Sequence, residues 1–320
     1  MNRYYAFNGD ADGLCALQQL RLNAPHDATL VTGVKRDIQL LRRIDAAAGD
    51  QITVLDISLD QNRDDLLRLL ASGATVRYFD HHYAGELPQH PGFASHIDGA
   101  PEVCTSLLVD RHLGGCHRAW AIVAAFGDSL QQVGHALAQQ HGISAQATAT
   151  LHELGLYLNY NAYGETLADL HFDPVALAAA MLPFADPLEF IRHSPVYRLL
   201  AAGYAEDMLA ARRLTPEHDV PGAPVMVMPN APWARRAIGV LANELMQARP
   251  QDALAILSPK ARDGYTVSVR VPAGHPVGAD EFCRSFDTGG GRRLAAGINH
   301  LPEADVEDFI ARFTTRFGAH

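Results

Sequence analysis

The stretch Tyr78-Phe79-Asp80-His81-His82 ends an apolar run of β-type residues with one carboxylate and two adjacent imidazoles. The run from Thr75 to Phe79 predicts a buried strand. Ligands of open α/β sheets collect beyond the carboxyl ends of the strands, so the residues that directly follow a strand are placed for chemistry. Burying two imidazoles beside a carboxylate is costly unless these groups have partners. The stretch therefore predicts a metal-binding strand end.

Two further predicted strands also end in acidic residues. Residues 3–8 run into Asp10 and Asp12, and residues 52–55 run into Asp56. The glycine after Asp12 would let the backbone pass close by. Each acid taken alone also fits a helix-capping turn, because Asp is a preferred N-cap residue. Parallel neighbouring strands would gather these carboxylates and the imidazoles around one pocket.

Five candidate metal ligands from four segments would then surround this pocket. They are Asp10, Asp12, Asp56, His81 and Asp128, the last from a break between two predicted helices. Mixed carboxylate and imidazole ligands suit Mn²⁺, with Mg²⁺, Co²⁺ or Zn²⁺ as alternatives. Five ligands are enough for two cations that share one bridging carboxylate.

The composition limits the class of protein. With 320 residues, 48% of them hydrophobic, the chain is expected to form two globular domains. A formal net charge of −10 argues against binding to long duplex nucleic acid, whereas a short anionic substrate is compatible with it. Lys35 and Lys260 are the only lysines, and we attribute the excess of arginine to genome composition.

The cysteines and the N-terminus indicate the compartment. Four widely spaced cysteines without a Cys-x-x-Cys pair predict neither a zinc ribbon nor a disulfide framework. The N-terminus enters a strand without signal-peptide features, and the longest apolar run, residues 119–126, is too short to span a bilayer. We expect a cytoplasmic protein with no membrane partner.

Predicted strands and helices alternate in the N-terminal part of the chain, which indicates a largely parallel sheet flanked by helices. The strands are expected at residues 3–8, 29–32, 52–55 and 75–79, and the helices at residues 14–22, 38–47 and 62–71. Proline and glycine then predict a loop at residues 88–92. Further helices are expected at residues 101–113, around residue 120, and at residues 130–140, 145–158 and 195–213.

Five prolines between residues 216 and 232 mark the clearest compositional boundary. Beyond it we expect strands at residues 225–228, 253–258 and 265–271, helices at residues 234–246 and 303–317, and a glycine loop at residues 289–291. The predicted fold is two-domain α/β, with the active site in the interdomain cleft. Its parts are a catalytic domain (1–194), a helical connector with a proline-rich linker (195–222) and a smaller α/β domain (223–320).

These motifs together resemble the DHH phosphoesterase superfamily, which is named for its Asp-His-His triplet. The residues that match it in order and approximate spacing are Asp10-Ala11-Asp12-Gly13, Asp56, Asp80-His81-His82 and Asp128. Residues 289–297, Gly-Gly-Gly-Arg-Arg-Leu-Ala-Ala-Gly, are similar to the Gly-Gly-Gly-His-x-x-Ala-Ala-Gly signature of the associated C-terminal domain. Val267-Ser268-Val269-Arg270 is similar to its substrate-binding Ser-x-Arg strand. The resemblance spans nearly the whole chain.

The resemblance implies a centre with two divalent cations, most simply Mn²⁺. Asp10 would hold one cation, Asp12 would hold the other, and Asp56 would bridge them. His81 and Asp128 would complete the second site.

The resemblance also implies roles outside the cation ligands. Asp80 would orient an imidazole, as histidines at metal sites usually require, and His82 would donate to a phosphoryl oxygen or the leaving group. Arg270 and Arg292 would add positive charge for the terminal phosphate of the substrate, with a solvated structural role as the alternative for each. The other substrate-binding candidates are the backbone N–H groups of Gly289, Gly290 and Gly291.

Two departures from the family pattern bear on these roles. Family members often carry a His or Asp just ahead of the Asp-x-Asp pair, where this chain has Ala6 and Asn8. Asn8 is a further candidate ligand through its amide oxygen, but the first cation should then bind more weakly. Arg292 replaces the signature histidine and still suits a phosphate, which it can bind bidentately.

The implied activity is hydrolysis of short oligonucleotides or dinucleotides to nucleoside 5′-monophosphates, as in a nano-RNase or short-oligonucleotide exonuclease. The same pocket would also suit cyclic dinucleotides, 3′-phosphoadenosine 5′-phosphate or a polyphosphate. A nucleotide-sensing module with a decayed metal site is the alternative of another class. Tyr160 and Tyr163 fit either a base-stacking lid or an ordinary polar helix end, and a homodimer stays open.

Overall fold

The computed structural model describes residues 1–319, and the chain divides into two units, Met1–Gly203 and the part from Tyr204 onward. Each unit has its own five-stranded sheet and its own hydrophobic core. The division falls within helix α9 (Pro195–Ala211). No helix within residues 1–319 is long and apolar enough to cross a membrane.

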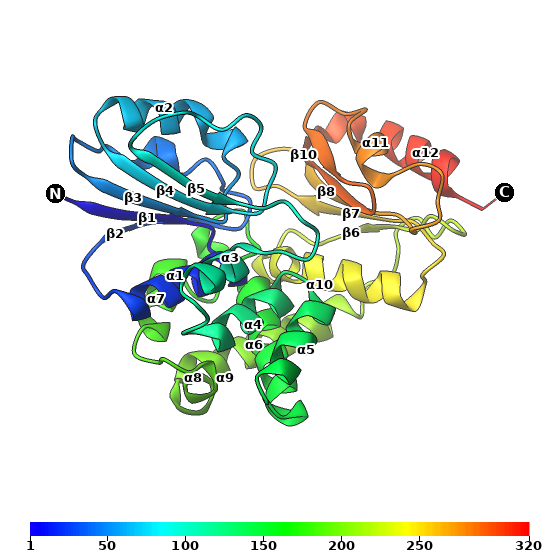
Figure 1. The fold of residues 1–320 in the computed structure, drawn as a ribbon. Helices are drawn as coiled ribbons and strands as arrows, with labels where there is room; N and C mark the ends of the chain where they lie inside the picture. The colour runs from blue at the N-terminus through cyan, green and yellow to red at the C-terminus, as the bar shows by residue number, and fades with distance from the viewer. Residues whose placement is uncertain (320) are drawn as a thin grey trace. The chain divides into compact units, whose positions relative to one another are not determined.

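The N-terminal sheet is entirely parallel, as the alternation of predicted strands and helices indicated. Its strand order is β2-β1-β3-β4-β5 (Figure 1). The strands are β1 (Arg3–Phe7), β2 (Thr29–Val31), β3 (Gln51–Leu55), β4 (Thr75–Asp80) and β5 (Phe93–Ile97). The prediction of a parallel N-terminal sheet is therefore confirmed.

Helices cover both faces of this sheet. Helix α2 lies on one face, and helices α1 and α3 lie on the other (Figure 1). The helices of this unit ahead of α9 are α1 (Ala11–Asn23), α2 (Arg63–Ala71), α3 (Thr105–His112), α4 (Arg118–Gly127), α5 (Gln131–Gln140), α6 (Ala145–Asn161), α7 (Pro174–Met181) and α8 (Pro187–His193). Strand side chains alternate between the two cores: Phe7 and Phe79 pack with Trp120, whereas Val54 and Tyr78 pack on the face of α2.

The helix predicted over residues 38–47 is wrong. Only a short 3₁₀ turn, Leu41–Arg43, forms in this segment. Its apolar residues are buried against α2 and the sheet, so their spacing reflects a packed irregular segment rather than a helix face. Arg68 of α2 donates to the carbonyls of Leu41 and Ile44 at 3.0 and 3.1 Å, which satisfies backbone groups that a helix would have paired internally.

Strand β5 and helices α7 and α8 had no counterpart among the predicted elements. β5 is an edge strand whose residues are half-buried or exposed, and it follows directly on the proline-rich loop. Its sequence, Phe-Ala-Ser-His-Ile, carries a weak apolar pattern for this reason. α7 and α8 each begin at a proline that is capped by the preceding Asp173 or Asp186, a start signal that short helices share with turns.

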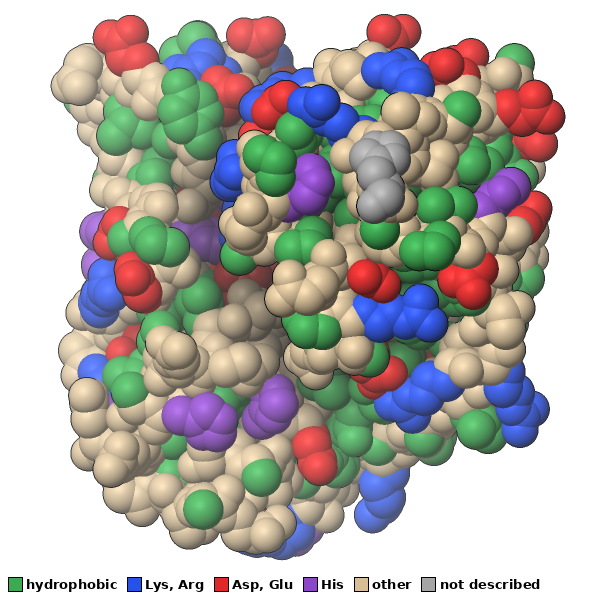
Figure 2. Space-filling model, turned by 90° about the vertical axis from the view of Figure 1, so that its right-hand side faces the viewer, with side chains coloured by type: hydrophobic (Ala, Val, Ile, Leu, Met, Phe, Trp, Pro, Cys, Tyr) green, Lys and Arg blue, Asp and Glu red, His purple; other side chains and the backbone are tan. Residues whose placement is uncertain are grey.

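The second unit contains a mixed sheet with the order β6-β7-β8-β10-β9. Its strands are β6 (Val225–Val227), β7 (Leu254–Pro259), β8 (Tyr265–Arg270), β9 (Gly289–Arg292) and β10 (Ala295–Leu301), and its helices are α10 (Pro232–Ala248), α11 (Ala279–Cys283) and α12 (Val306–Phe317). Four aromatic rings, Phe282, Phe309, Phe313 and Phe317, pack together between α11 and α12. The face drawn in Figure 2 carries interspersed acidic and basic side chains.

The glycine run expected as a loop forms an edge strand instead. Gly289–Arg292 pairs antiparallel with β10. A Cβ atom on Gly289 would lie 1.7 Å from the carbonyl oxygen of Cys283, and one on Gly291, whose φ is +141°, would lie 2.5 Å from the Cα of Ala296. A Cβ atom on Gly290 would meet no heavy atom within 4 Å. Close packing therefore requires the two outer glycines, while the middle one faces open space.

We predict that Gly289→Ala destabilises the second unit by about 3 kcal/mol, because the new methyl group collides with backbone. Gly290→Ala in the same strand is the matched control, with a change below about 1 kcal/mol. Urea denaturation of both variants and the parent measures the difference. Equal stability of the two variants would contradict the packing of β9 against Cys283.

Candidate metal centre

The carboxyl ends of three adjacent parallel strands are level with one another. The register aligns the ends of β1, β3 and β4, and the ladder continues one step further because Asn8 N–H donates to the Leu55 carbonyl and Asp56 N–H donates to the Phe79 carbonyl. Asn8 and Asp56 therefore follow β1 and β3, and Asp80 is the last residue of β4, so that all three lie at one edge of the sheet; all three are buried. The predicted gathering of strand-end polar groups is present.

Asp56 is held in a backbone conformation that few non-glycine residues adopt. Its φ is +60°, a left-handed value that Asp and Asn tolerate better than most residues. Its carboxylate is almost fully buried, and its Oδ1 accepts a hydrogen bond of 3.1 Å from the Thr105 hydroxyl. Backbone strain that survives at a buried acid is typical of a functional position.

His81 presents one defined ring nitrogen to the carboxylates. Its Nδ1 lies 3.0 Å from the Val103 carbonyl oxygen, which can only accept a hydrogen bond, so Nδ1 carries a proton. The other nitrogen, Nε2, lies 3.4 Å from Asp56 Oδ1 and 3.9 Å from Asp128 Oδ2. A backbone carbonyl that fixes the ring in this way is the usual arrangement around a metal-binding histidine.

Asp12 joins the centre through the N-terminus of helix α3. Its Oδ2 and Oδ1 accept hydrogen bonds of 2.7 Å from the backbone N–H groups of Thr105 and Ser106, where the helix dipole favours a negative charge. Gly13 allows the close approach that the sequence predicted, because a Cβ atom there would lie 2.1 Å from the Asn8 carbonyl oxygen. Thr105 thus contacts both Asp12 and Asp56.

Asp80 orients the second imidazole of the triplet. Its Oδ1 accepts hydrogen bonds from His82 Nδ1 at 2.7 Å and from the His81 backbone N–H at 2.9 Å. Asp80 is fully buried, and its Oδ2 has no hydrogen-bond partner within the described part of the chain. The His82 side chain is 45% exposed, so its remaining ring nitrogen, Nε2, is available to a substrate.

The carboxylates perturb one another strongly. Burial raises the pKa of Asp56 well above its usual range, and the charges of Asp12 and Asp10 raise it further. Burial also raises the pKa of Asp128, with Asp12 as the next cause. Burial alone would lower the pKa of His81, but the hydrogen bond and charge of Asp56 raise it to about 10. A bound cation would favour the charged forms of Asp56 and Asp128 and would oppose these upward pKa shifts.

Four of the five predicted ligands fit a divalent cation. Asp12, Asp56, His81 and Asp128 combine carboxylate oxygens with an imidazole nitrogen whose tautomer is fixed, the donor set that suits Mn²⁺ and related ions. Ligand atoms of Asp56, His81 and the adjacent His82 all lie within 4.8 Å of one another.

Asp10 has different partners. Its Oδ1 caps helix α1 by accepting from the N–H groups of Asp12 and Gly13 at 3.0 and 3.1 Å, and its Oδ2 pairs with the Lys35 ammonium group. Burial, the largest single cause, would raise the pKa of Asp10, but the charge of Lys35 and the hydrogen bonds from Lys35 and the Gly13 N–H together outweigh it, so the pKa is lowered. Asp10 therefore caps the helix, as the sequence also allowed, but only through Oδ1.

Asn8 lies next to this ion pair. Its Nδ2 is 3.4 Å from the Lys35 carbonyl oxygen, and its buried Oδ1 has no hydrogen-bond partner among the residues described. An unsatisfied amide oxygen fits its predicted role as a weak ligand, which stays a prediction.

The sequence interpretation missed Lys35, Asn159 and Thr105. Lys35 donates to Asn159 Oδ1 at 2.7 Å in addition to pairing with Asp10. The sequence offered one indication of a special role for Lys35: only two of the 26 basic residues in the chain are lysines. Thr105 carried no signal, because its contact with Asp56 joins segments 49 positions apart.

The tyrosines near residue 160 separate into two environments. Tyr160 is fully buried, and its hydroxyl lies 2.8 Å from His171 Nε2, so a base-stacking role for Tyr160 is wrong. Tyr163 is partly buried, and the Lys35 ammonium lies 5.6 Å from the centre of its ring. The amide- and tyrosine-rich stretch thus supports Lys35 from the end of helix α6.

The second unit brings its two candidate arginines onto one face of the sheet. Ala295 of β10 is opposite Arg270 on one side and Arg292 on the other, and directly opposite residues point to the same face. Arg270 also donates to Ser268 Oγ at 2.9 Å, within the predicted Ser-x-Arg strand. This arrangement suits an anionic group above β10.

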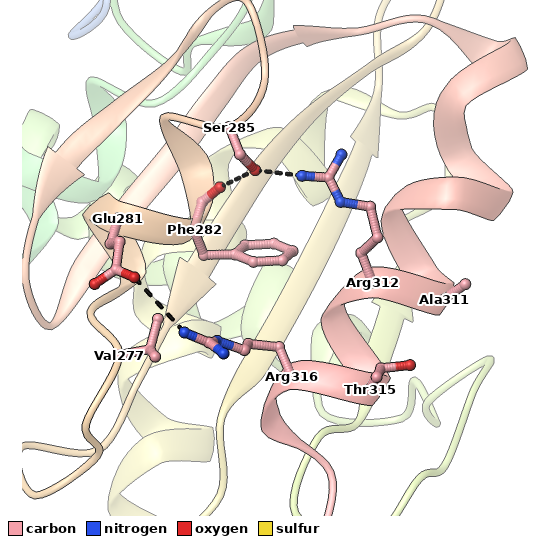
Figure 3. A pocket seen from close by; sticks show the side chains of 8 residues that line it. All are labelled: Val277, Glu281, Phe282, Ser285, Ala311, Arg312, Thr315 and Arg316. Carbon is pink, nitrogen blue, oxygen red and sulfur yellow. Dashed lines mark hydrogen bonds and ion pairs between the residues drawn. The ribbon is translucent and has the colours of Figure 1, made fainter.

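A separate groove of about 540 Å³ lies between α11 and α12. Its Arg312 donates to Ser285 Oγ at 2.6 Å, and its Arg316 lies 3.6 Å from the Glu281 carboxylate (Figure 3). Both guanidinium groups are therefore already paired with groups of the groove. Its described lining includes neither Arg270 nor the glycine strand, so we assign it no part in the site.

Solved structures share this fold. The crystal structure of exonuclease RecJ bound to manganese has a TM-score of 0.64 with 18% identity, over 98% of this chain and 89% of that chain. RecJ from Thermus thermophilus in complex with Mn²⁺ has a TM-score of 0.60 with 18% identity, over 98% of this chain and 51% of that chain. The pGpG-specific phosphodiesterase PggH from Vibrio cholerae has a TM-score of 0.56 with 13% identity, over 99% of this chain and 100% of that chain.

The chain has the RecJ-type fold. This confirms, at the level of the fold, the resemblance carried by the Asp-x-Asp, Asp-His-His and triple-glycine motifs. No protein-family model matches the sequence, and no curated protein matches it either. In this chain Asp12, Asp56, His81 and Asp128, together called the strand-end cluster, lie at the carboxyl edge of the parallel sheet, where open α/β sheets bind ligands.

We predict that cation binding releases a proton from His81, because Nε2 needs its lone pair to bind a metal. With the pKa raised to about 10, Mn²⁺ affinity should rise up to about tenfold per pH unit between pH 7 and about 9. In the metal-free protein the same raised pKa stabilises the fold fully below pH 6.5, and this contribution disappears as pH rises through about 10.

Isothermal titration calorimetry in buffers of different ionisation enthalpy counts the released protons. His81→Gln should abolish this release together with tight binding, whereas His82→Gln, the matched control, should keep it. Affinity that is independent of pH in the parent protein would rule out His81 as a ligand.

Proposed function

We propose that the chain is a divalent-cation-dependent phosphodiesterase of the DHH superfamily that hydrolyses short oligonucleotides or dinucleotides to nucleoside 5′-monophosphates. The observation that carries this proposal is the cluster of the buried Asp12 and Asp56 with the partly buried His81 and Asp128 at the carboxyl edge of a parallel sheet. Acids with raised pKa values around an imidazole of fixed tautomer are typical of a hydrolytic metal centre.

In this proposal the cation ligands and His82 have different roles. Asp12, Asp56, His81 and Asp128 would hold a cation, which supplies a Lewis acid for the phosphoryl group and lowers the pKa of a nearby water. His82, oriented by Asp80 through Nδ1, would use Nε2 to donate a hydrogen bond or a proton to the leaving oxygen. This assignment needs no covalent intermediate on the enzyme.

The second unit would bind the terminal phosphate of the substrate. Arg270 and Arg292 flank Ala295 on one face of the sheet, and guanidinium groups bind phosphate oxygens in bidentate geometry. The edge strand adds backbone N–H groups, and Gly290 leaves open space beside them. Two arginines and one short edge strand are a small binding surface, which favours a short substrate.

Two further observations favour a short substrate over a long duplex. The net charge of −10 disfavours binding along an extended polyanion. PggH, a solved structure that the match covers over its full length, is named for a linear dinucleotide, pGpG. Of the alternatives, the nucleotide-sensing module is favoured by one observation, the engagement of Asp10 by Lys35.

We predict that Mn²⁺-supported kcat/KM for a 5′-phosphorylated dinucleotide exceeds that for a longer single strand by about tenfold or more. The measurement is turnover on one panel that also contains a cyclic dinucleotide, 3′-phosphoadenosine 5′-phosphate and pyrophosphate. Arg292→Ala should raise KM for the dinucleotide and leave the metal content unchanged, since it would contact substrate only.

Faster turnover of the cyclic dinucleotide, of 3′-phosphoadenosine 5′-phosphate or of pyrophosphate would replace the proposed substrate. No turnover on any member, with folded and metal-loaded protein, would overturn the proposed activity in favour of the sensing module.

A further inference from the structure

The ammonium group of Lys35 lies within the strand-end cluster, on the side of Asp10. It pairs with Asp10 Oδ2 and donates to Asn159 Oδ1 at 2.7 Å. The Lys35 side chain is 24% exposed and that of Asp10 is 4% exposed. This ion pair is therefore largely shielded from water. Because water screens it less, the pair is stronger than an ion pair on the surface.

The backbone holds Lys35 in this position. Strand β2 is parallel to β1, so the loop that follows β2 emerges at the same edge of the sheet as Asp10. Lys35 N–H donates to the Ala162 carbonyl at 2.9 Å. A Cβ atom on Gly9 would lie 2.3 Å from the Gly33 carbonyl oxygen, so the loops after β1 and β2 are in close contact. These backbone contacts fix Lys35 beside Asp10.

Both carboxylate oxygens of Asp10 are engaged without a metal ion. Oδ1 accepts two backbone hydrogen bonds at the start of α1, and Oδ2 pairs with Lys35. The position ahead of the Asp-x-Asp pair holds Asn8, a neutral residue. Asp10 and Asn8 together therefore offer one carboxylate that is already neutralised, which is a poor site for a divalent cation.

A lysine suits this position better than an arginine does. Its ammonium group is a compact point charge with three donors, whereas a guanidinium group is planar and wide. Two of the donors face Asp10 and Asn159, and the ring of Tyr163 lies 5.6 Å away, within range of a cation–π interaction. In a chain whose basic residues are arginines except for Lys35 and Lys260, this partly buried cation is a lysine.

The charges of the cluster also favour one divalent cation. The Lys35 ammonium already occupies the free side of the Asp10 carboxylate. A second divalent ion bound there would place two cations beside the same carboxylate, which Coulomb repulsion disfavours in a buried site.

We propose that the Lys35 ammonium takes the place of the first divalent cation, so that the centre binds a single divalent ion on Asp12, Asp56, His81 and Asp128. Asp10 and Asn159 are then positioning residues that hold the ammonium. The inference rests on the proposed function, because it specifies the cation content of that centre.

The stoichiometry of bound Mn²⁺ tests this proposal without an activity measurement. We expect one Mn²⁺ per parent chain, with the electron paramagnetic resonance spectrum of an isolated ion. Lys35→Met keeps the length of the side chain and removes its charge, so it should raise the stoichiometry to two and give the spectrum of a coupled Mn²⁺ pair. Lys260→Met, at the other lysine of the chain, is the matched control and should stay at one.

The measured Mn²⁺ stoichiometries distinguish failure of the Lys35 proposal from failure of the proposed function. Two Mn²⁺ per parent chain would overturn the Lys35 proposal and leave the metal-dependent function standing, whereas none would overturn both. A stoichiometry of one in Lys35→Met would show that the ammonium does not exclude a second ion. Should that variant fail to fold, Asp10→Asn should still bind one Mn²⁺, and loss of this ion would make Asp10 a metal ligand and overturn the proposal.

Discussion

The mutual repulsion of buried carboxylates is the constraint on which the N-terminal unit depends. Asp12 and Asp56 lie just beyond the ends of parallel strands at one edge of the sheet, and Asp128 lies at the C-terminal end of α4. Holding these charges together in a largely buried site is costly unless cations neutralise them. The Lys35 ammonium is one such cation, and we propose a divalent ion as another. The hydrogen bonds that join Thr105 to Asp56 and His81 to the Val103 carbonyl fix the positions of the side chains that would hold that ion.

The parts of this centre that lie at strand ends could be predicted from the sequence. Apolar runs that stop at Asp56 or at Asp80-His81-His82 mark both the strand and its end, and the alternation with helices makes the strands parallel. Parallel neighbours bring their ends together without any further information. The same argument extends to Asp12, where the glycine that follows permits the close backbone approach seen at Asn8.

The remaining parts depend on contacts between distant segments. Residues 38–47 have helix-like apolar spacing, but Arg68 caps their carbonyls and they pack as an irregular segment. Gly289–Arg292 forms a strand because β10 offers an edge to pair with. Lys35 meets Asn159 across 124 positions of sequence, and no local pattern around either residue indicates that contact.

Divalent-cation binding by Asp12, Asp56, His81 and Asp128 is tested by comparing the thermal shift that Mn²⁺ produces in the parent protein with the shift in Asp56→Asn. Asn keeps the size of the side chain and tolerates the positive φ of this position. At a free concentration of 100 times Kd, Mn²⁺ should stabilise the parent protein by about 2.7 kcal/mol and raise its Tm. We expect Asp56→Asn to fold and to lose this shift, whereas a full shift in the variant would show that Asp56 does not bind the cation.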